Sequence, residues 1–105
     1  MGKRSVDYRE DLMNALKDPE ERAAYINAAL EDGDTRVLLT ALKNIAEANG
    51  GVGKLATRTK LARESLYRML SKEGNPELKS LDKILRSFGL KLSVQPERHG
   101  SPAQR

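Results

Sequence analysis

The sequence contains no cysteine and no tryptophan, and its 105 residues include one histidine and one phenylalanine. Without cysteine, the chain has no disulfide framework and no thiolate nucleophile. The histidine, His99, lies in the polar C-terminal stretch PERHGSPAQR, and Ser65 has no base near it in the sequence. We therefore expect no enzyme, no metal site and no cofactor. The scarcity of aromatic side chains also disfavours a surface that stacks the bases of a single-stranded nucleic acid.

Long apolar runs are missing as well. No run in the sequence approaches the roughly 20 residues that a membrane-spanning helix needs. The first ten residues, MGKRSVDYRE, lack the apolar segment of a secretory signal. We therefore expect a soluble, cytoplasmic protein with no membrane partner. A chain of 105 residues is long enough for one compact domain with a modest core.

The charged residues are unevenly divided between the two halves of the chain. Residues 1–50 hold 7 Lys and Arg against 10 Asp and Glu, a net charge of −3. Residues 51–105 hold 12 against 5, a net charge of +7. A basic half suits a polyanion, because the release of counterions favours binding to DNA. Charge alone does not separate a DNA-binding surface from one that is merely well solvated.

Apolar residues recur at helical spacing through most of the chain, which predicts an all-α protein of five to six helices. Residues 1–6 are expected to form a loose arm. The helices are expected at residues 8–17, 19–31, 35–48, in two short pieces within 53–70, and at 77–87. The third and the last of them carry the clearest core faces: Val37, Leu38, Ala41, Leu42, Ile45 and Ala46, and then Leu78, Leu81, Ile84, Leu85 and Phe88.

Three short segments mark the helix boundaries. Asp18-Pro19 supplies an N-cap and a first-turn proline, and Asp32-Gly33-Asp34 and Asn49-Gly50-Gly51 break the chain. The acids near Gly33 also suggest a metal site, but they lack the EF-hand spacing. The glycines suggest a phosphate-binding loop, but the Gly-Lys-Ser/Thr order is missing. Helix breaks are therefore the favoured interpretation of both segments.

The stretch from Gly53 to Leu70, GKLATRTKLARESLYRML, predicts two short helices joined by a tight turn near Lys60 and Leu61. Ala56 is placed where the two helices cross, and a small side chain there lets the backbones approach. The second helix turns Leu66, Met69 and Leu70 inward and Arg63, Glu64, Ser65, Tyr67 and Arg68 outward. This layout suits a helix-turn-helix that inserts a polar helix face into the major groove of DNA. The alternative is an ordinary helical hairpin with a solvated basic face.

Beyond Gly89, three apolar residues alternate with polar ones, which predicts a short strand: Leu90, Leu92 and Val94. A lone strand has unpaired backbone groups along its edges. We therefore expect this strand to pair with the same strand of a second copy. The residues from Pro96 onward are expected to form a frayed tail.

Residues 53–89 resemble the Cro/repressor-type (xenobiotic response element) helix-turn-helix family. The matching positions, in order, are Leu55-Ala56, Leu61, Arg63, Leu66, Arg68, Asn75-Pro76, Leu78, Leu81, Ile84 and Phe88-Gly89. From Asp7 to Pro96 the chain also resembles the probable addiction-module antidote proteins, a branch of antitoxins allied to the HigA type. The stretches that carry this resemblance are AAYINAALEDGD, LLTALKNIAEANGGVGKLA and LARESLYRMLSKEGNPELKSLDKILRSFGLKLSV.

The resemblance implies a lambda-repressor-like helix-turn-helix domain over residues 35–95, preceded by an N-terminal helical extension over 1–34 and followed by a flexible tail over 96–105. It also implies a sequence-specific DNA-binding antitoxin of a type II toxin–antitoxin module. Such a protein neutralises an adjacent RelE/ParE-like toxin and represses its own operon. The acidic residues 7–34 are then the candidate toxin surface, because such toxins tend to be basic. The alternative is a prophage-type or stand-alone transcriptional repressor without a toxin partner.

The partners implied are double-stranded operator DNA, a cognate toxin and a second copy of the chain, since one reading helix covers only a half-site. By position in the family motif, the base-reading residues are Arg63, Glu64, Ser65 and Arg68, and the phosphate-contacting residues are Lys54, Thr57, Arg58, Tyr67 and Lys72. Two residues depart from the motif. Lys60 stands where the turn commonly has Gly, and Ala62 stands where Ser or Thr often caps the reading helix.

Overall fold

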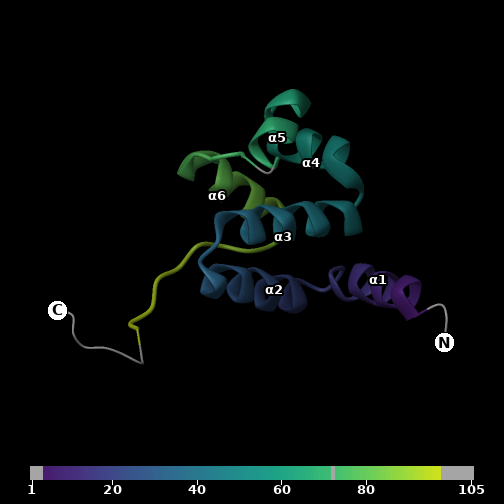
Figure 1. Ribbon diagram of the computed structural model, residues 1–105. Helices are drawn as coiled ribbons and strands as arrows, with labels where there is room; N and C mark the ends of the chain where they lie inside the picture. The colour runs from purple at the N-terminus through teal and green to yellow at the C-terminus, as the bar shows by residue number, and fades with distance from the viewer. Residues whose placement is uncertain (1–3, 72, 98–105) are drawn as a thin grey trace.

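The computed structural model describes residues 4–71 and 73–97, and for residues 4–7 it describes the backbone alone. The described residues form six α-helices (Figure 1), which confirms the expected all-α class. In chain order they are α1 (Arg4–Ala15), α2 (Pro19–Asp32), α3 (Thr35–Ala48), α4 (Gly51–Thr59), α5 (Arg63–Met69) and α6 (Leu78–Ser87). The expected loose arm is wrong for residues 4–6, which are helical, and residues 1–3 lie outside the described part of the chain.

The expected helix boundaries are confirmed at both ends of α2. The Asp18 side chain accepts a hydrogen bond from the backbone N–H of Glu20 at 3.0 Å, and Pro19 is the first helical residue. Gly33 ends α2 in a left-handed conformation, with φ 86°, which glycine adopts without steric cost. Asp34 then caps α3 by accepting from the N–H of Arg36 at 2.9 Å.

α3 is the central helix of the molecule. It packs against α1, α2 and α4, and α6 packs against α4. In Figure 1, α1 and α2 lie below α3, and α4 and α5 lie above it. Each buried Leu or Ile stabilises the fold by roughly 1.5–3 kcal/mol through removal of apolar surface from water. The fully buried large side chains are Leu16, Leu39, Leu42, Ile45, Leu66, Leu70 and Ile84.

Two expected core positions are wrong. Leu78 leaves 71% of its surface exposed and Val37 leaves 38%. Both residues stand in the first turn of their helix, and Val37 lines an open groove between α2 and α3. The buried face begins about one turn later in α6, at Leu81, and directly after Val37 in α3, at Leu38 and Leu39.

The predicted strand over residues 90–95 is also wrong, since residues 90–97 have no regular secondary structure. Leu90 packs against the core, whereas Leu92 and Val94 are 42% and 97% exposed. A strand needs a neighbour to receive its backbone hydrogen bonds, and nothing in the described chain offers one at this edge. The alternation of apolar and polar residues therefore does not produce a strand here, because the segment has no neighbouring strand among the described residues to which it can form backbone hydrogen bonds.

A single guanidinium joins three parts of the fold. Arg22, in α2, donates to the carbonyl oxygens of Leu16 at 2.8 Å, Lys17 at 2.9 Å and Phe88 at 2.6 Å. It also donates to the side-chain oxygen of Asn49 at 2.7 Å. These acceptors follow the C-terminal ends of α1, α3 and α6, where helix dipoles place partial negative charge. Arg22 therefore ties the N-terminal helices to the helices that carry the candidate site.

Candidate nucleic-acid interface

The first component of the site is the tight turn between α4 and α5. Lys60, at the end of α4, has φ 62° and is the only residue other than glycine with positive φ in the described chain. Leu61 and Ala62 then lead directly into α5. The turn lies where the sequence predicts it, and its left-handed residue is Lys60, which stands where the family motif commonly has Gly.

Hydrogen bonds from Thr59 fix the angle of this turn. Its buried hydroxyl group donates to the carbonyl oxygen of Leu55 at 2.8 Å and accepts from the N–H of Leu61 at 3.3 Å. The N–H of Lys60 donates to the carbonyl oxygen of Ala56 at 2.8 Å. Sequence reasoning missed Thr59, because a threonine at a helix end has many possible partners and only the folded turn selects these two.

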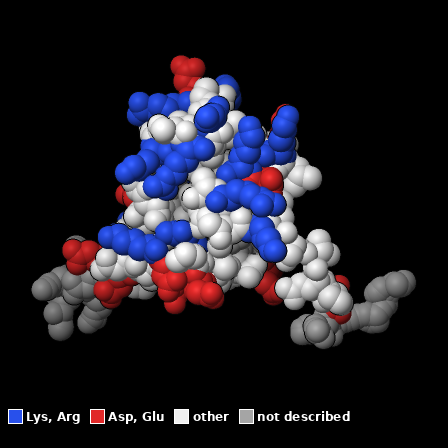
Figure 2. All heavy atoms as spheres, turned by 180° about the vertical axis from the view of Figure 1, so that it is seen from behind, with Lys and Arg blue, Asp and Glu red and all other residues white. Residues whose placement is uncertain are grey.

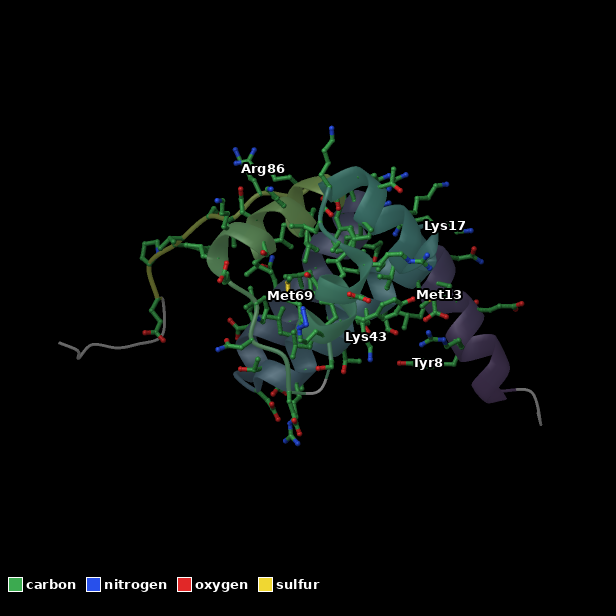
Figure 3. The ribbon with its side chains drawn as sticks, turned by 90° about the horizontal axis from the view of Figure 1, so that it is seen from above. Tyr8, Met13, Lys17, Lys43, Met69 and Arg86 are labelled. Carbon is green, nitrogen blue, oxygen red and sulfur yellow. The ribbon has the colours of Figure 1, made fainter. Side chains whose placement is uncertain are left out.

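The second component is α5 itself, which is strongly two-sided. Leu66 and Leu70 are 0% and 2% exposed, and Met69 is partly buried (Figure 3). This inward face confirms the sequence prediction. On the other side, the side chains of Arg63, Glu64, Tyr67 and Arg68 are exposed, and Ser65 is partly buried. Of the four residues predicted to contact bases, Arg63, Glu64 and Arg68 are thus exposed, and Ser65 is partly covered.

Three of these side chains lie beside other parts of the chain, and Arg63 is the one that packs over a neighbouring helix. The Arg63 guanidinium lies over Gly53 in α4, so that a Cβ added at Gly53 would be 3.6 Å from its nearest nitrogen. Ser65 and Arg68 line the edge of an open groove of about 600 Å³ between α5, the following loop and the start of α6. A side chain that is already braced loses less rotamer entropy when it binds a partner.

The predicted phosphate-contacting residues on α4 differ in whether their donor groups already form a bond within the protein. Lys54 and Arg58 are exposed, and no ion pair of the described residues involves either. Thr57 is exposed too, but its hydroxyl group donates to the carbonyl oxygen of Gly53 at 3.2 Å. It would have to give up this bond to donate to a phosphate, which is an acceptor only. Lys72 lies outside the described residues.

Further basic side chains flank α5 on both sides, and sequence reasoning missed them. Lys43 of α3 shares a groove with Tyr67, while Lys83 and Arg86 of α6 share another with Arg58. Seen from above in Figure 3, Lys43 and Arg86 project on opposite sides of Met69. These residues stand on α3 and α6, so the sequence pattern of α4 and α5 carries no signal of their nearness.

The charge distribution separates the top of the molecule from its base. Figure 2 shows Lys and Arg spread over the upper part, where α4 and α5 lie in Figure 1, with single acidic groups among them, and most of the visible Asp and Glu along the lower edge. Residues 51–88 hold 9 Lys and Arg against 4 Asp and Glu, a net charge of +5. The exposed side of α5 therefore stands in a positive field that attracts phosphate groups.

The acids near Gly33 lie at the break between α2 and α3, where Asp32 accepts from the N–H of Asp34 at 3.3 Å. The described residues contain no group of His, Cys, Asp and Glu side chains able to hold a metal ion. Asp34 instead accepts from the side chain and the backbone N–H of Arg36, and these bonds lower the pKa of its carboxyl group.

Within the described chain, none of the helices has the length and apolar character to cross a membrane.

Comparison with known proteins adds a family and one relative. A family model described as "Probable addiction module antidote protein" matches residues 8–96. An uncharacterized protein of Haemophilus influenzae is 32% identical over 88 residues, which cover 84% of this chain and 90% of the relative. No solved structure matches the chain. The matched residues include most of α1, all of α2 to α6, and the extended segment after α6.

Proposed function

Because the chain belongs to the family of probable addiction module antidote proteins, we propose that it is a DNA-binding antitoxin that neutralises a cognate toxin and represses their shared operon. The family membership expected from the sequence is confirmed; the HigA-type branch and the RelE/ParE-like class of the toxin are part of the proposal. DNA as a partner implies action in the cytoplasm.

The observation that carries DNA binding is the two-sided character of α5. Its apolar side is buried against the rest of the protein, and its polar side is exposed. In a lambda-repressor-like helix-turn-helix, α5 would enter the major groove with α4 crossing above it. Arg63 and Arg68 would donate to the O6 and N7 atoms of guanine, Glu64 would accept from the N4 amino group of cytosine, and Ser65 would bond to either.

The basic residues around α5 would bind the phosphate backbone. Lys54, Arg58 and Tyr67 would hold phosphates from the α4–α5 side, and Thr57 would join them after a change of rotamer. Such contacts fix the orientation of the protein on the duplex but carry no sequence information. Lys43 and Arg86, on opposite sides of α5, are suited to the two strands that border one groove.

A homodimer completes the proposal. One α5 covers a half-site, and two copies related by a two-fold axis would place their reading helices about 34 Å apart. The exposed apolar side chains of Leu92 and Val94 are the proposed contact between copies.

An electrophoretic mobility shift on the DNA upstream of the gene tests the repressor role. At a stated salt concentration, the protein should shift this DNA in preference to a scrambled sequence of equal length. Equal binding to both would contradict sequence-specific repression.

The second candidate function is that of a stand-alone repressor without a toxin. Co-expression with the protein encoded by the adjacent reading frame separates the two functions. Association and rescue of growth support the antitoxin, whereas DNA binding without either result supports the stand-alone repressor.

A further inference from the structure

An open groove of about 590 Å³ runs between α2 and α3. Small or apolar side chains form much of its wall: Tyr25, Ala28 and Ala29 from α2, and Val37, Thr40 and Ala41 from α3. Ala28 and Thr40 are exposed, and Val37 leaves 38% of its surface uncovered. Small side chains along two packed helices leave room for the ridge of a third helix to approach their backbones.

The position of this groove separates it from the proposed DNA-binding surface. α2 lies on the side of α3 that is remote from α4 and α5 (Figure 1). None of the residues proposed to contact bases or phosphates lines the groove. A partner seated there would leave the polar side of α5 open, so the protein would be able to hold that partner and DNA together.

Charge identifies the kind of partner. Residues 4–34 hold 4 Lys and Arg against 9 Asp and Glu, a net charge of −5. Two of the four cations are already engaged: Arg22 bonds inward to backbone carbonyls, and Arg9 pairs with Glu47 at 2.7 Å. In the described chain, no ion pair involves an acid of α2. Such a surface repels phosphate groups and attracts cations.

The acids are also placed along the groove. Glu21, Tyr25, Ala28 and Asp32 are spaced by four, three and four residues, which puts them on one side of α2. Tyr25, Ala28 and Asp32 line the groove, so Glu21 continues the same side toward the start of the helix. At the far end Arg36 pairs with Asp34 at 3.2 Å, so the unpaired negative charge lies on the α2 wall.

We propose that the α2–α3 groove is the docking site for the cognate toxin, and that it receives a cationic amphipathic helix of that protein. Apolar side chains of the helix fill the space above Ala28 and Ala41. Its Lys or Arg side chains pair with Glu21 and Asp32. The inference rests on the proposed antitoxin function, because it supplies the partner for a surface that DNA reading does not use.

Binding to the product of the adjacent reading frame tests the groove, with purified full-length chains and with Ala28→Arg as the principal variant. Arginine favours helix nearly as well as alanine, so α2 should remain folded, and the far-ultraviolet circular dichroism should be unchanged. The matched control is Asn27→Arg, which adds the same side chain to an exposed position on the opposite side of α2. The affinity should fall at least about tenfold in Ala28→Arg and stay within about twofold in Asn27→Arg.

Charge reversals at two neighbouring positions test whether the acids on the groove side of α2 contribute to binding. Glu21→Lys should weaken toxin binding and flatten its dependence on salt, while Glu20→Lys, which points to the other side of α2, should change both much less. Binding of operator DNA should be the same in Ala28→Arg as in the wild-type protein.

Three other results would overturn the docking site, alone or together with the antitoxin function. Wild-type affinity in both Ala28→Arg and Glu21→Lys would overturn the docking site while leaving the antitoxin function intact. A change from dimer to monomer in sedimentation of Ala28→Arg would show that a second copy occupies the groove, and would also overturn it. Failure of the wild-type protein to bind the product would overturn the antitoxin function and this inference together.

Discussion

At the scale of single residues, the turn between α4 and α5 determines how the candidate site is presented. The position of the turn is predictable from the sequence, and the resemblance to the family motif marks Lys60 and Ala62 as its two unusual residues. The structure has Lys60 in a left-handed conformation and Ala62 without a side-chain cap bond. The double hydrogen bond of Thr59 and the placement of Arg63 over Gly53 depend on how two helices meet, and no local pattern encodes that.

The first prediction concerns the backbone at Lys60. A left-handed conformation costs a non-glycine residue about 1–2 kcal/mol, while glycine loses roughly 0.5–1 kcal/mol more backbone entropy on folding. Lys60→Gly should therefore raise the free energy of unfolding by up to about 1 kcal/mol, measured by urea titration. Lys83→Gly, inside α6, is the control and should lose about 1 kcal/mol. A loss in both variants would mean that Lys60 is not strained.

The second prediction concerns the start of α5. Ala62 has an extended conformation suited to an N-cap, with φ −67° and ψ 141°, but makes no side-chain cap bond. Ala62→Ser supplies an acceptor for an N–H of the first turn, so it should stabilise the protein by about 1 kcal/mol. Thermal unfolding provides the measurement, and Ala62→Val, which has no hydrogen-bond acceptor in its side chain, is the comparison. Equal melting temperatures for the serine and valine variants would argue against a capping bond.

At the scale of elements, the boundaries of α2 and α3 are predictable because their start and stop signals lie in the adjacent sequence. The Asp18-Pro19 start, the Gly33 stop and the cap at Asp34 need only neighbours in sequence. The errors arise where an element depends on something distant. The segment around Leu92 has no strand beside it, and Arg22 bonds to Phe88 across 66 positions of sequence. The same reasoning explains why the basic side chains of α3 and α6 beside α5 were missed.

The third prediction tests the junction at Arg22. The planar guanidinium reaches four acceptors at once, and an ammonium group with three donors on a flexible stem does not reproduce that fork. Arg22→Lys should therefore lower the free energy of unfolding by about 2–3 kcal/mol, as one or more charged hydrogen bonds are lost.

The control is Arg36→Lys, and the free energy of unfolding of both variants is measured by chemical denaturation. Arg36 forms an exposed ion pair with Asp34, and such pairs contribute about 0–1 kcal/mol. If the two variants lost equal stability, the junction would have no special role in holding the helices together.

At the scale of the whole molecule, the two ends of the protein differ in charge and in proposed partner. The acidic helices α1 and α2 lie at the base, and the basic helices α4 and α5 lie at the top (Figures 1 and 2). This division is predictable from the charge of the two halves of the sequence. The grooves are not, because each is formed by side chains of helices that meet only in the folded protein.

The fourth prediction concerns assembly. If the extended C-terminal segment joins two copies, replacing both Leu92 and Val94 with Ser should shift the protein from dimer to monomer in sedimentation. Leu78→Ser is the control, because Leu78 is also exposed, at 71%, but stands at the start of α6. A dimer that persists in the double variant would place the interface elsewhere.

The central claim is that the exposed polar side of α5 distinguishes one DNA sequence from another. Its most direct test is a competition mobility shift between the gene's own upstream DNA and a scrambled duplex, with wild-type protein, Arg68→Ala and Arg58→Ala. Arg68→Ala should lose about 1–3 kcal/mol of discrimination, whereas Arg58→Ala should weaken binding to both duplexes equally and lower the salt slope by about 1. Absence of any preference in the wild-type protein, or unchanged discrimination in Arg68→Ala, would contradict the claim.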